Sequence, residues 1–155
     1  MELIRAILNY QFGKNVGNKF LEKYKDRIKL EISKNTGRVR RIFIDDKLFG
    51  TIEPTTGFII LTYYGGNIIK EFLPFKRYRV IISDEAVPFV SEGKSVFCKF
   101  VLDVDENILP NDIVLVVDKR DNLIAVGVSL LSSTEMKLFN RGVAVKVKDA
   151  RNNNI

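Results

Sequence analysis

The chain has 155 residues, 46% of them hydrophobic, which is enough for one domain or two small domains with packed cores. Histidine is absent and there is one cysteine, so histidine general bases, an internal disulfide and an ordinary zinc site are excluded. The net charge of +6 favours a polyanionic partner.

The first half begins with helical patterns and then changes to strand patterns. Apolar residues recur at helical spacing over residues 2–12 and 16–24, and Gly13 can end the first helix. Alternating runs bounded by turn clusters predict strands at 28–32, 38–44, 48–52, 58–64 and 78–83. Gly65-Gly66 is expected to break the fourth strand, and Asn67 to cap a short helix through Phe72. This order is typical of an α+β unit with an antiparallel sheet.

The second half is expected to begin at an acidic, proline-containing segment, Asp84–Ser91. We therefore expect two domains, residues 1–83 and 84–155. β-branched runs follow at Ser95–Val104, Ile113–Asp118, Leu123–Leu131 and Val143–Val147. A short helix is expected before the last run, because Ser132 and Glu135 have the spacing of a capping box. Short strands so closely spaced predict a small barrel or sandwich.

Several motifs of the second half resemble the PUA domain, an RNA-binding barrel. They are the opening Gly93-Lys94-Ser95-Val96-Phe97, Pro110-Asn111-Asp112 before a valine-rich strand, and the ending Arg141–Val147. In the first half, Gln11-Phe12-Gly13 and Ile32–Arg40 resemble the C2 domain that precedes the PUA domain in archaeal tRNA-guanine transglycosylase. The resemblance implies an α+β C2-like domain followed by a PUA-like β-barrel.

The catalytic features of that family are not found in this sequence. The family's large barrel carries an Asp nucleophile and base and a Cys/His zinc site, whereas this sequence offers no nucleophile–base set. The resemblance therefore implies a non-catalytic subunit or module for archaeosine biosynthesis. It would bind the acceptor stem and 3′ end of tRNA while a separate catalytic transglycosylase chain performs the chemistry.

The resemblance places an RNA groove beside the turn Gly93-Lys94-Ser95. The cations expected around this groove are Lys94, Lys99, Arg141, Lys146 and Lys148. Lys146 and Lys148 alternate with valines, so they should face outward about 7 Å apart, close to the spacing of phosphates along a strand. Phe97 either stacks on a base or packs within the protein, and the sequence leaves both open.

A basic hairpin is the second expected RNA contact. Lys34, Arg38 and Arg40 lie in and just after one turn, where cations spaced a few ångströms apart can neutralise phosphates. Residues 1–83 carry 16 Lys and Arg against 8 Asp and Glu, whereas residues 84–155 carry 9 against 11. An ordinary solvated hairpin explains the pattern equally well, because Arg40 and Arg41 point to opposite faces of any strand.

Other interpretations of the whole chain remain open. One is a ribosome-biogenesis or translation factor that binds rRNA, and another is a protein–protein adaptor whose basic half meets an acidic partner. No apolar run approaches the roughly 20 residues of a membrane span, and no signal peptide is evident, so we expect a cytoplasmic protein. Neither a metal nor another cofactor is expected. Cys98 is interpreted as a buried small hydrophobe, and the acids between Asp103 and Asp112 as solubilising loop charge.

Overall fold

The computed structural model describes residues 1–152 and divides into two compact units, Met1–Leu73 and Pro74–Ile155. This division corrects the boundary expected near Asp84. The strand β5 (Arg79–Ile82), which we had assigned to the first domain, pairs with strands β7 and β8 of the second sheet. The pairing partners of a strand, and not the composition of the segment after it, decide the unit to which it belongs.

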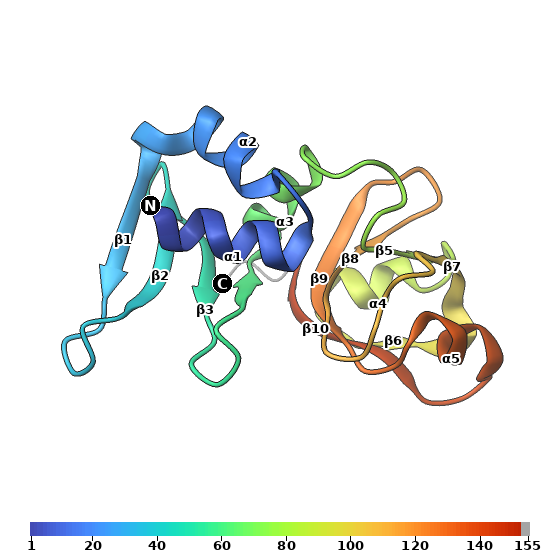
Figure 1. The fold of residues 1–155 in the computed structure, drawn as a ribbon. Helices are drawn as coiled ribbons and strands as arrows, with labels where there is room; N and C mark the ends of the chain where they lie inside the picture. The colour runs from blue at the N-terminus through green and yellow to red at the C-terminus, as the bar shows by residue number, and fades with distance from the viewer. Residues whose placement is uncertain (153–155) are drawn as a thin grey trace. The chain divides into compact units, whose positions relative to one another are not determined.

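The first unit is a four-stranded antiparallel sheet with helices (Figure 1). Its elements are α1 (Glu2–Phe12), α2 (Val16–Tyr24), η1 (Lys25–Arg27), β1 (Ile28–Ile32), β2 (Val39–Ile44), β3 (Lys47–Ile52), β4 (Ile59–Leu61) and α3 (Tyr63–Lys70). The strands follow one another in the order β1-β2-β3-β4. The buried rings of Phe20 and Phe49, 5.0 Å apart, join α2 to β3 in the core. The predicted α+β unit is confirmed.

The segment after β4 differs from the prediction. The strand expected over 58–64 ends at Leu61, and Thr62 caps α3 by accepting a hydrogen bond from the Gly65 N–H. Gly65 lies inside the helix, where a Cβ atom would come within 2.0 Å of the Phe49 carbonyl oxygen. The glycine pair therefore permits close packing of α3 on β3 instead of breaking a strand, and Asn67 is not the cap.

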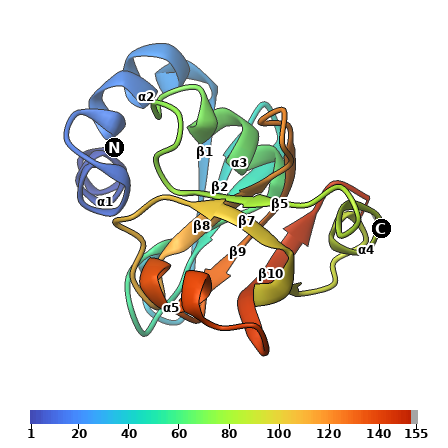
Figure 2. The same cartoon turned by 90° about the vertical axis from the view of Figure 1, so that its right-hand side faces the viewer.

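The second unit is a six-stranded mixed sheet that curls into a nearly closed barrel (Figure 2). Its elements are β5, α4 (Val87–Ser91), β6 (Val96–Phe97), η2 (Cys98–Phe100), β7 (Val101–Val104), β8 (Ile113–Val117), β9 (Leu123–Ser129), α5 (Ser133–Leu138) and β10 (Val143–Ala150). The strand order is β6-β10-β9-β8-β5-β7. Its two end strands, β6 and β7, are consecutive in the chain and joined only by η2, so the sheet bends back on itself. The predicted barrel and the Ser132–Glu135 capping box are confirmed.

The run Ser95–Val104 is not the single strand expected. The one-turn helix η2 interrupts it at Cys98, and this turn carries the chain from one end strand of the sheet to the other. Cys98 is 3% exposed, as expected for a small buried hydrophobe, and burial raises the pKa of its thiol. Val96 is buried beside it, whereas Phe100 is only half-buried.

Two of the acids interpreted as solubilising loop charge, Asp103 and Asp105, form ion pairs within the second unit. Lys76 pairs with Asp103 at 2.6 Å, Arg77 with Asp105 at 3.2 Å and Arg79 with Asp121 at 3.2 Å. Asp105 is 7% exposed and also accepts a hydrogen bond from the Tyr78 N–H. Because these cations enter with β5, residues 74–155 carry 12 Lys and Arg against 11 acids, and residues 1–73 carry 13 against 8.

Candidate nucleic-acid interface

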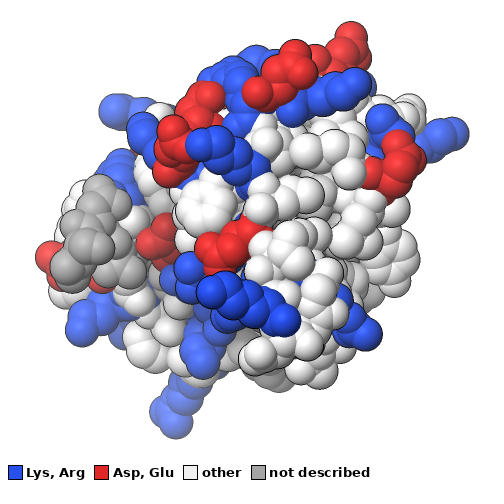
Figure 3. Space-filling view, turned by 90° about the vertical axis from the view of Figure 1, so that its left-hand side faces the viewer, with Lys and Arg blue, Asp and Glu red and all other residues white. Residues whose placement is uncertain are grey.

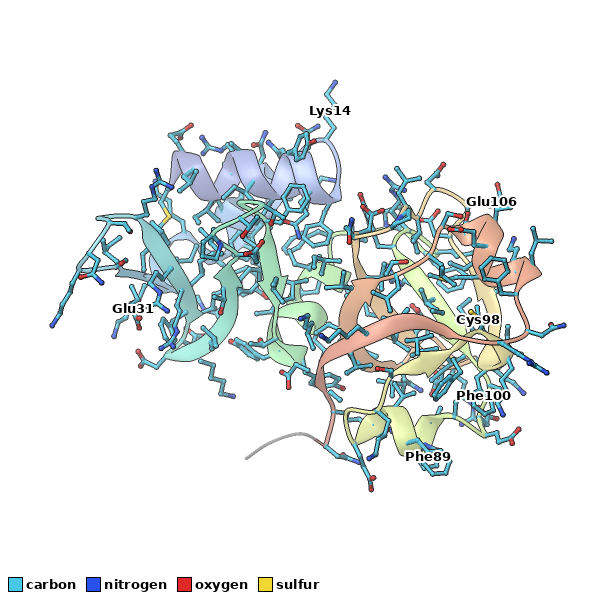
Figure 4. The ribbon with its side chains drawn as sticks, turned by 90° about the horizontal axis from the view of Figure 1, so that it is seen from below. Lys14, Glu31, Phe89, Cys98, Phe100 and Glu106 are labelled. Atoms are coloured by element: carbon cyan, nitrogen blue, oxygen red, sulfur yellow. The ribbon has the colours of Figure 1, made fainter. Side chains whose placement is uncertain are left out.

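An apolar pocket of about 270 Å³ opens beside the Gly93-Lys94-Ser95 turn of the second unit. It is built by α4, the turn after it, β6 and η2, and its lining residues are Ala86, Phe89, Val90, Lys94, Ser95, Phe97 and Phe100. In Figure 4, the labelled Phe89 and Phe100 lie on one side of the barrel, with Cys98 further inside.

The aromatic walls of this pocket are accessible. Phe89 is 59% exposed and Phe97 is 46% exposed, so neither ring is part of the core. The Lys99 ammonium lies 5.0 Å from the centre of the Phe100 ring, and Lys94 lines the rim. Aromatic faces beside cations suit a planar, partly charged ligand such as an unpaired nucleotide, whose base can stack while its phosphate meets an ammonium.

The backbone conformation at position 93 favours glycine. Its φ is +103°, a region that residues with a Cβ atom rarely adopt. The Gly93 N–H donates to the Val90 carbonyl and the Lys94 N–H to the Phe89 carbonyl, so the turn ends α4 and brings Lys94 back over it. A valine at position 93 would therefore strain the turn as well as fill space.

Strand pairing brings the start of β10 to the pocket. Val143 is opposite Phe97, and the Cys98 N–H donates to the Gly142 carbonyl at 3.0 Å, so Arg141 directly precedes the segment that pairs beside the pocket. Lys146 and Lys148 are exposed, as expected. They lie further along the strand, and the register of β10 against β9 shifts between Val147 and Asp149. The bulge leaves Lys148 without a partner residue on β9, although both lysines keep the outward position predicted for them.

The basic hairpin belongs to the first unit and joins β1 to β2. Lys34, Arg38 and Arg40 are exposed, and among residues 1–152 none of them makes an ion pair. Arg41 differs, because it pairs with Glu31 at 3.6 Å. Figure 3 views the molecule from the left-hand side of Figure 1. Lys and Arg side chains gather toward the lower end of this view, while acidic and basic groups alternate along its upper edge.

The described residues contain neither a membrane-spanning helix nor a metal-binding cluster. Within residues 1–152 no helix is both long and apolar enough to cross a membrane. The same residues contain no group of three His, Cys, Asp or Glu side chains placed to hold a metal ion.

Two protein families together match almost the whole chain. Residues 2–76 match the patch-forming domain C2 of tRNA-guanine transglycosylase, and residues 78–150 match the PUA domain. Their junction agrees with the division of the structure after Leu73. The resemblance inferred from the sequence motifs is confirmed.

Curated full-length relatives also match nearly the whole chain. The chain is 44% identical over 145 residues to the tRNA-guanine(15) transglycosylase of Methanosphaera stadtmanae, and 41% identical to that of Thermococcus onnurineus. The alignments cover 94% of this chain but only 22% and 24% of those enzymes. The chain thus spans less than a quarter of the length of the curated relatives it matches.

Solved structures show the same fold. A hypothetical protein from Pyrococcus horikoshii is similar over 97% of this chain and 89% of its own, with a TM-score of 0.74 and 27% identity. A conserved PUA domain protein from Thermoplasma acidophilum is similar over 88% of this chain and 89% of its own, with a TM-score of 0.60 and 18% identity. The second unit is therefore a PUA-like barrel.

Proposed function

Because this chain consists of a domain of the C2 family of tRNA-guanine transglycosylase and a domain of the PUA family, we propose that it is a non-catalytic RNA-binding module and that its RNA is tRNA. The observation that carries the proposal is the exposed aromatic pocket beside Lys94 on the PUA-like barrel. An RNA stem presents phosphates and 2′-hydroxyls, whereas only unpaired nucleotides can insert a base between aromatic rings.

The 3′ end of the acceptor stem is the tRNA segment that fits this surface. Its unpaired nucleotides can reach the pocket, while the adjoining stem lies against cations. Phe89, Phe97 and Phe100 supply stacking faces, and Lys94 supplies charge in the pocket lining. Lys99 beside the Phe100 ring and Arg141 just before β10 would add to this charge. Lys146 and Lys148 continue the basic track along β10. Base stacking contributes about 1–3 kcal/mol per base, so a single nucleotide would account for a measurable share of the affinity.

The test compares tRNA with and without its 3′ CCA on two matched variants. Phe89→Ala with Phe97→Ala removes two pocket walls, whereas Phe75→Ala removes a ring that is 64% exposed and does not line the pocket. We expect the pocket variant to bind intact tRNA at least about tenfold more weakly, and trimming to cost it little more. Equal losses from trimming in the wild type and the pocket variant would show that the 3′ end is held elsewhere.

We further propose that this C2 and PUA region acts together with a transglycosylase catalytic domain, which supplies the base-exchange chemistry. The relatives are more than four times longer than the aligned segment, and the part matched here contains their C2 and PUA regions. Crosslinking in native cell extract, followed by sequencing of the bound RNA, distinguishes this role from the rRNA-binding alternative. Recovery of ribosomal RNA in place of tRNA would favour the alternative.

A further inference from the structure

Two of the hairpin loops in the first unit have the same backbone structure. Loop 33–38 joins β1 to β2 and loop 53–58 joins β3 to β4, and Figure 1 shows both at the same end of the sheet. Their sequences, with one flanking residue on each side, are ISKNTGRV and IEPTTGFI. The glycines at their fifth loop positions, Gly37 and Gly57, have φ values of +70° and +76°.

The hydrogen bonds of the two loops coincide. Ser33 N–H donates to the Arg38 carbonyl at 2.8 Å, as Glu53 N–H does to the Phe58 carbonyl. The Thr36 hydroxyl accepts from the Arg38 N–H at 3.3 Å, and the equivalent bond in the second loop is 3.2 Å. Gly37 and Gly57 likewise each donate to the first loop residue's carbonyl, at 2.9 and 2.8 Å. The same backbone therefore presents two different sets of side chains.

The second loop contains an anion that the first loop lacks. The two carboxylate oxygens of Glu53 accept hydrogen bonds from the N–H groups of Thr55 and Thr56, each at 3.0 Å. These bonds lower the pKa of the Glu53 carboxyl, the Thr55 N–H having the largest effect. Successive backbone N–H groups in a turn form a concave site for an anion, and here a carboxylate fills it.

In the first loop the same site is empty. Ser33 stands where Glu53 stands, and its short side chain brings no carboxylate to the loop. Among residues 1–152, the N–H groups of Asn35 and Thr36 have no acceptor. Two cations flank them, Lys34 and Arg38, at the positions that Pro54 and Phe58 occupy in the second loop. The loop therefore combines unused donors with positive charge.

From this internal comparison we infer that the tip of the β1–β2 hairpin is a phosphate-binding site, with the Asn35 and Thr36 N–H groups as donors to a phosphodiester of RNA. The Glu53 carboxylate in the second hairpin marks where the phosphate oxygens lie. Lys34 and Arg38 neutralise the remaining charge. The inference rests on the proposed RNA-binding function and assigns one backbone contact of that function to a defined pair of amides.

In the first experiment, the full chain is titrated with inorganic phosphate and the backbone amide signals are monitored by NMR. We expect the Asn35 and Thr36 amides to shift with phosphate, while the Thr55 and Thr56 amides, already bonded to Glu53, stay in place. In Ser33→Glu the new carboxylate should fill the first loop, so the phosphate response of Asn35 and Thr36 should disappear. A wild type whose Asn35 and Thr36 amides ignore phosphate would overturn the inference, whatever the chain does with RNA.

The second experiment measures tRNA affinity in a charge-matched pair. Ser33→Glu with Glu53→Ser moves the carboxylate from one hairpin to the other without changing the net charge of the chain. We expect this double variant to bind tRNA about tenfold more weakly than the wild type at low salt, from the loss of charge-assisted hydrogen bonds. Unchanged affinity would show that the hairpin tip does not contact RNA. Failure of the wild type to bind tRNA would instead contradict the proposed function and leave the phosphate titration to decide the site.

Discussion

Single polar side chains complete the backbone hydrogen bonding of neighbouring elements in both units. The buried Gln11 of α1 donates to the Ile59 carbonyl at 2.7 Å and accepts from the Ile59 N–H at 2.8 Å. The side chain thus gives both backbone groups of this β4 residue a hydrogen-bond partner. Asp105 serves the Tyr78 N–H in the same way. Their environments explain why these residues are polar although they are buried: each replaces a strand or turn partner that the fold does not otherwise supply.

Replacing Gln11 should therefore destabilise the first unit more than its size suggests. Gln11→Leu keeps the volume but leaves the Ile59 N–H and carbonyl buried without this partner, which we expect to cost about 2–4 kcal/mol. Asn67→Leu, an exposed position on α3, is the control and should change stability little. Urea unfolding of both variants gives the comparison, and a Gln11→Leu protein as stable as the control would contradict this role.

A second residue-scale prediction concerns acid sensitivity. The hydrogen bond from Lys76, more than any other contact, lowers the pKa of the Asp103 carboxyl from its ordinary value. A carboxyl whose pKa is lower in the folded state contributes stability above its unfolded pKa, and this stability is lost as the pH falls through the folded value. The melting temperatures of the wild type and Lys76→Met should thus differ at pH 6 and converge as the pH drops below about 4. Lys119→Met is the control, because it disrupts an exposed pair with Asp84 at 3.8 Å. Its melting temperature should stay close to that of the wild type at pH 6.

At the scale of elements, alternation and turn signals predicted most strands but not the places where packing overrides them. Gly65-Gly66 is a turn signal by composition, yet the carbonyl of Phe49 requires glycine inside a helix. The run Ser95–Val104 alternates like one strand, yet barrel closure requires a turn in its middle. Both errors arise because the determining partner lies elsewhere in the chain, where a local pattern contains no trace of it.

The candidate site was predictable in part for the same reason. The motif around Gly93 pointed to the turn and its cations, but Phe89 and Phe100 were missed as pocket walls. Phe89 lies in a segment interpreted as a boundary, and its exposure follows from the short helix α4. The duplicated hairpins were visible as ISKNTGRV and IEPTTGFI, but only the hydrogen bonds distinguish a filled loop from an empty one.

At the scale of the whole molecule, the position of the boundary has a testable consequence. In the sheet order of the second unit, β5 lies between β8 and β7 and brings Lys76, Arg77 and Arg79 to their acidic partners. A fragment of residues 74–155 should therefore melt cooperatively on its own. A fragment of residues 84–155 lacks β5 and should give neither a cooperative melt nor a dispersed NMR spectrum. Independent folding of the shorter fragment would contradict the assignment of β5.

The distribution of charge over the molecule leads to the last prediction. The first unit has the larger basic excess, and the unpaired cations Lys34, Arg38 and Arg40 lie in and beside loop 33–38. Each phosphate contact releases counterions on binding, so removing it flattens the dependence of log affinity on log salt by about one unit. Arg38→Ala with Arg40→Ala should flatten the slope for tRNA by up to about two units.

The matched control removes the same amount of charge at the opposite end of the sheet. Lys29 pairs with Asp46 at 2.8 Å, and Lys47 lies over the Tyr64 ring, 5.3 Å from its centre. Lys29→Ala with Lys47→Ala should leave the salt slope close to that of the wild type, because these cations are occupied within the protein and lie away from loops 33–38 and 53–58. Equal flattening in both pairs would mean that RNA responds to net charge alone. Binding to tRNA that is independent of salt would instead favour the protein-adaptor interpretation, since a phosphate backbone cannot be bound by cations without releasing its counterions.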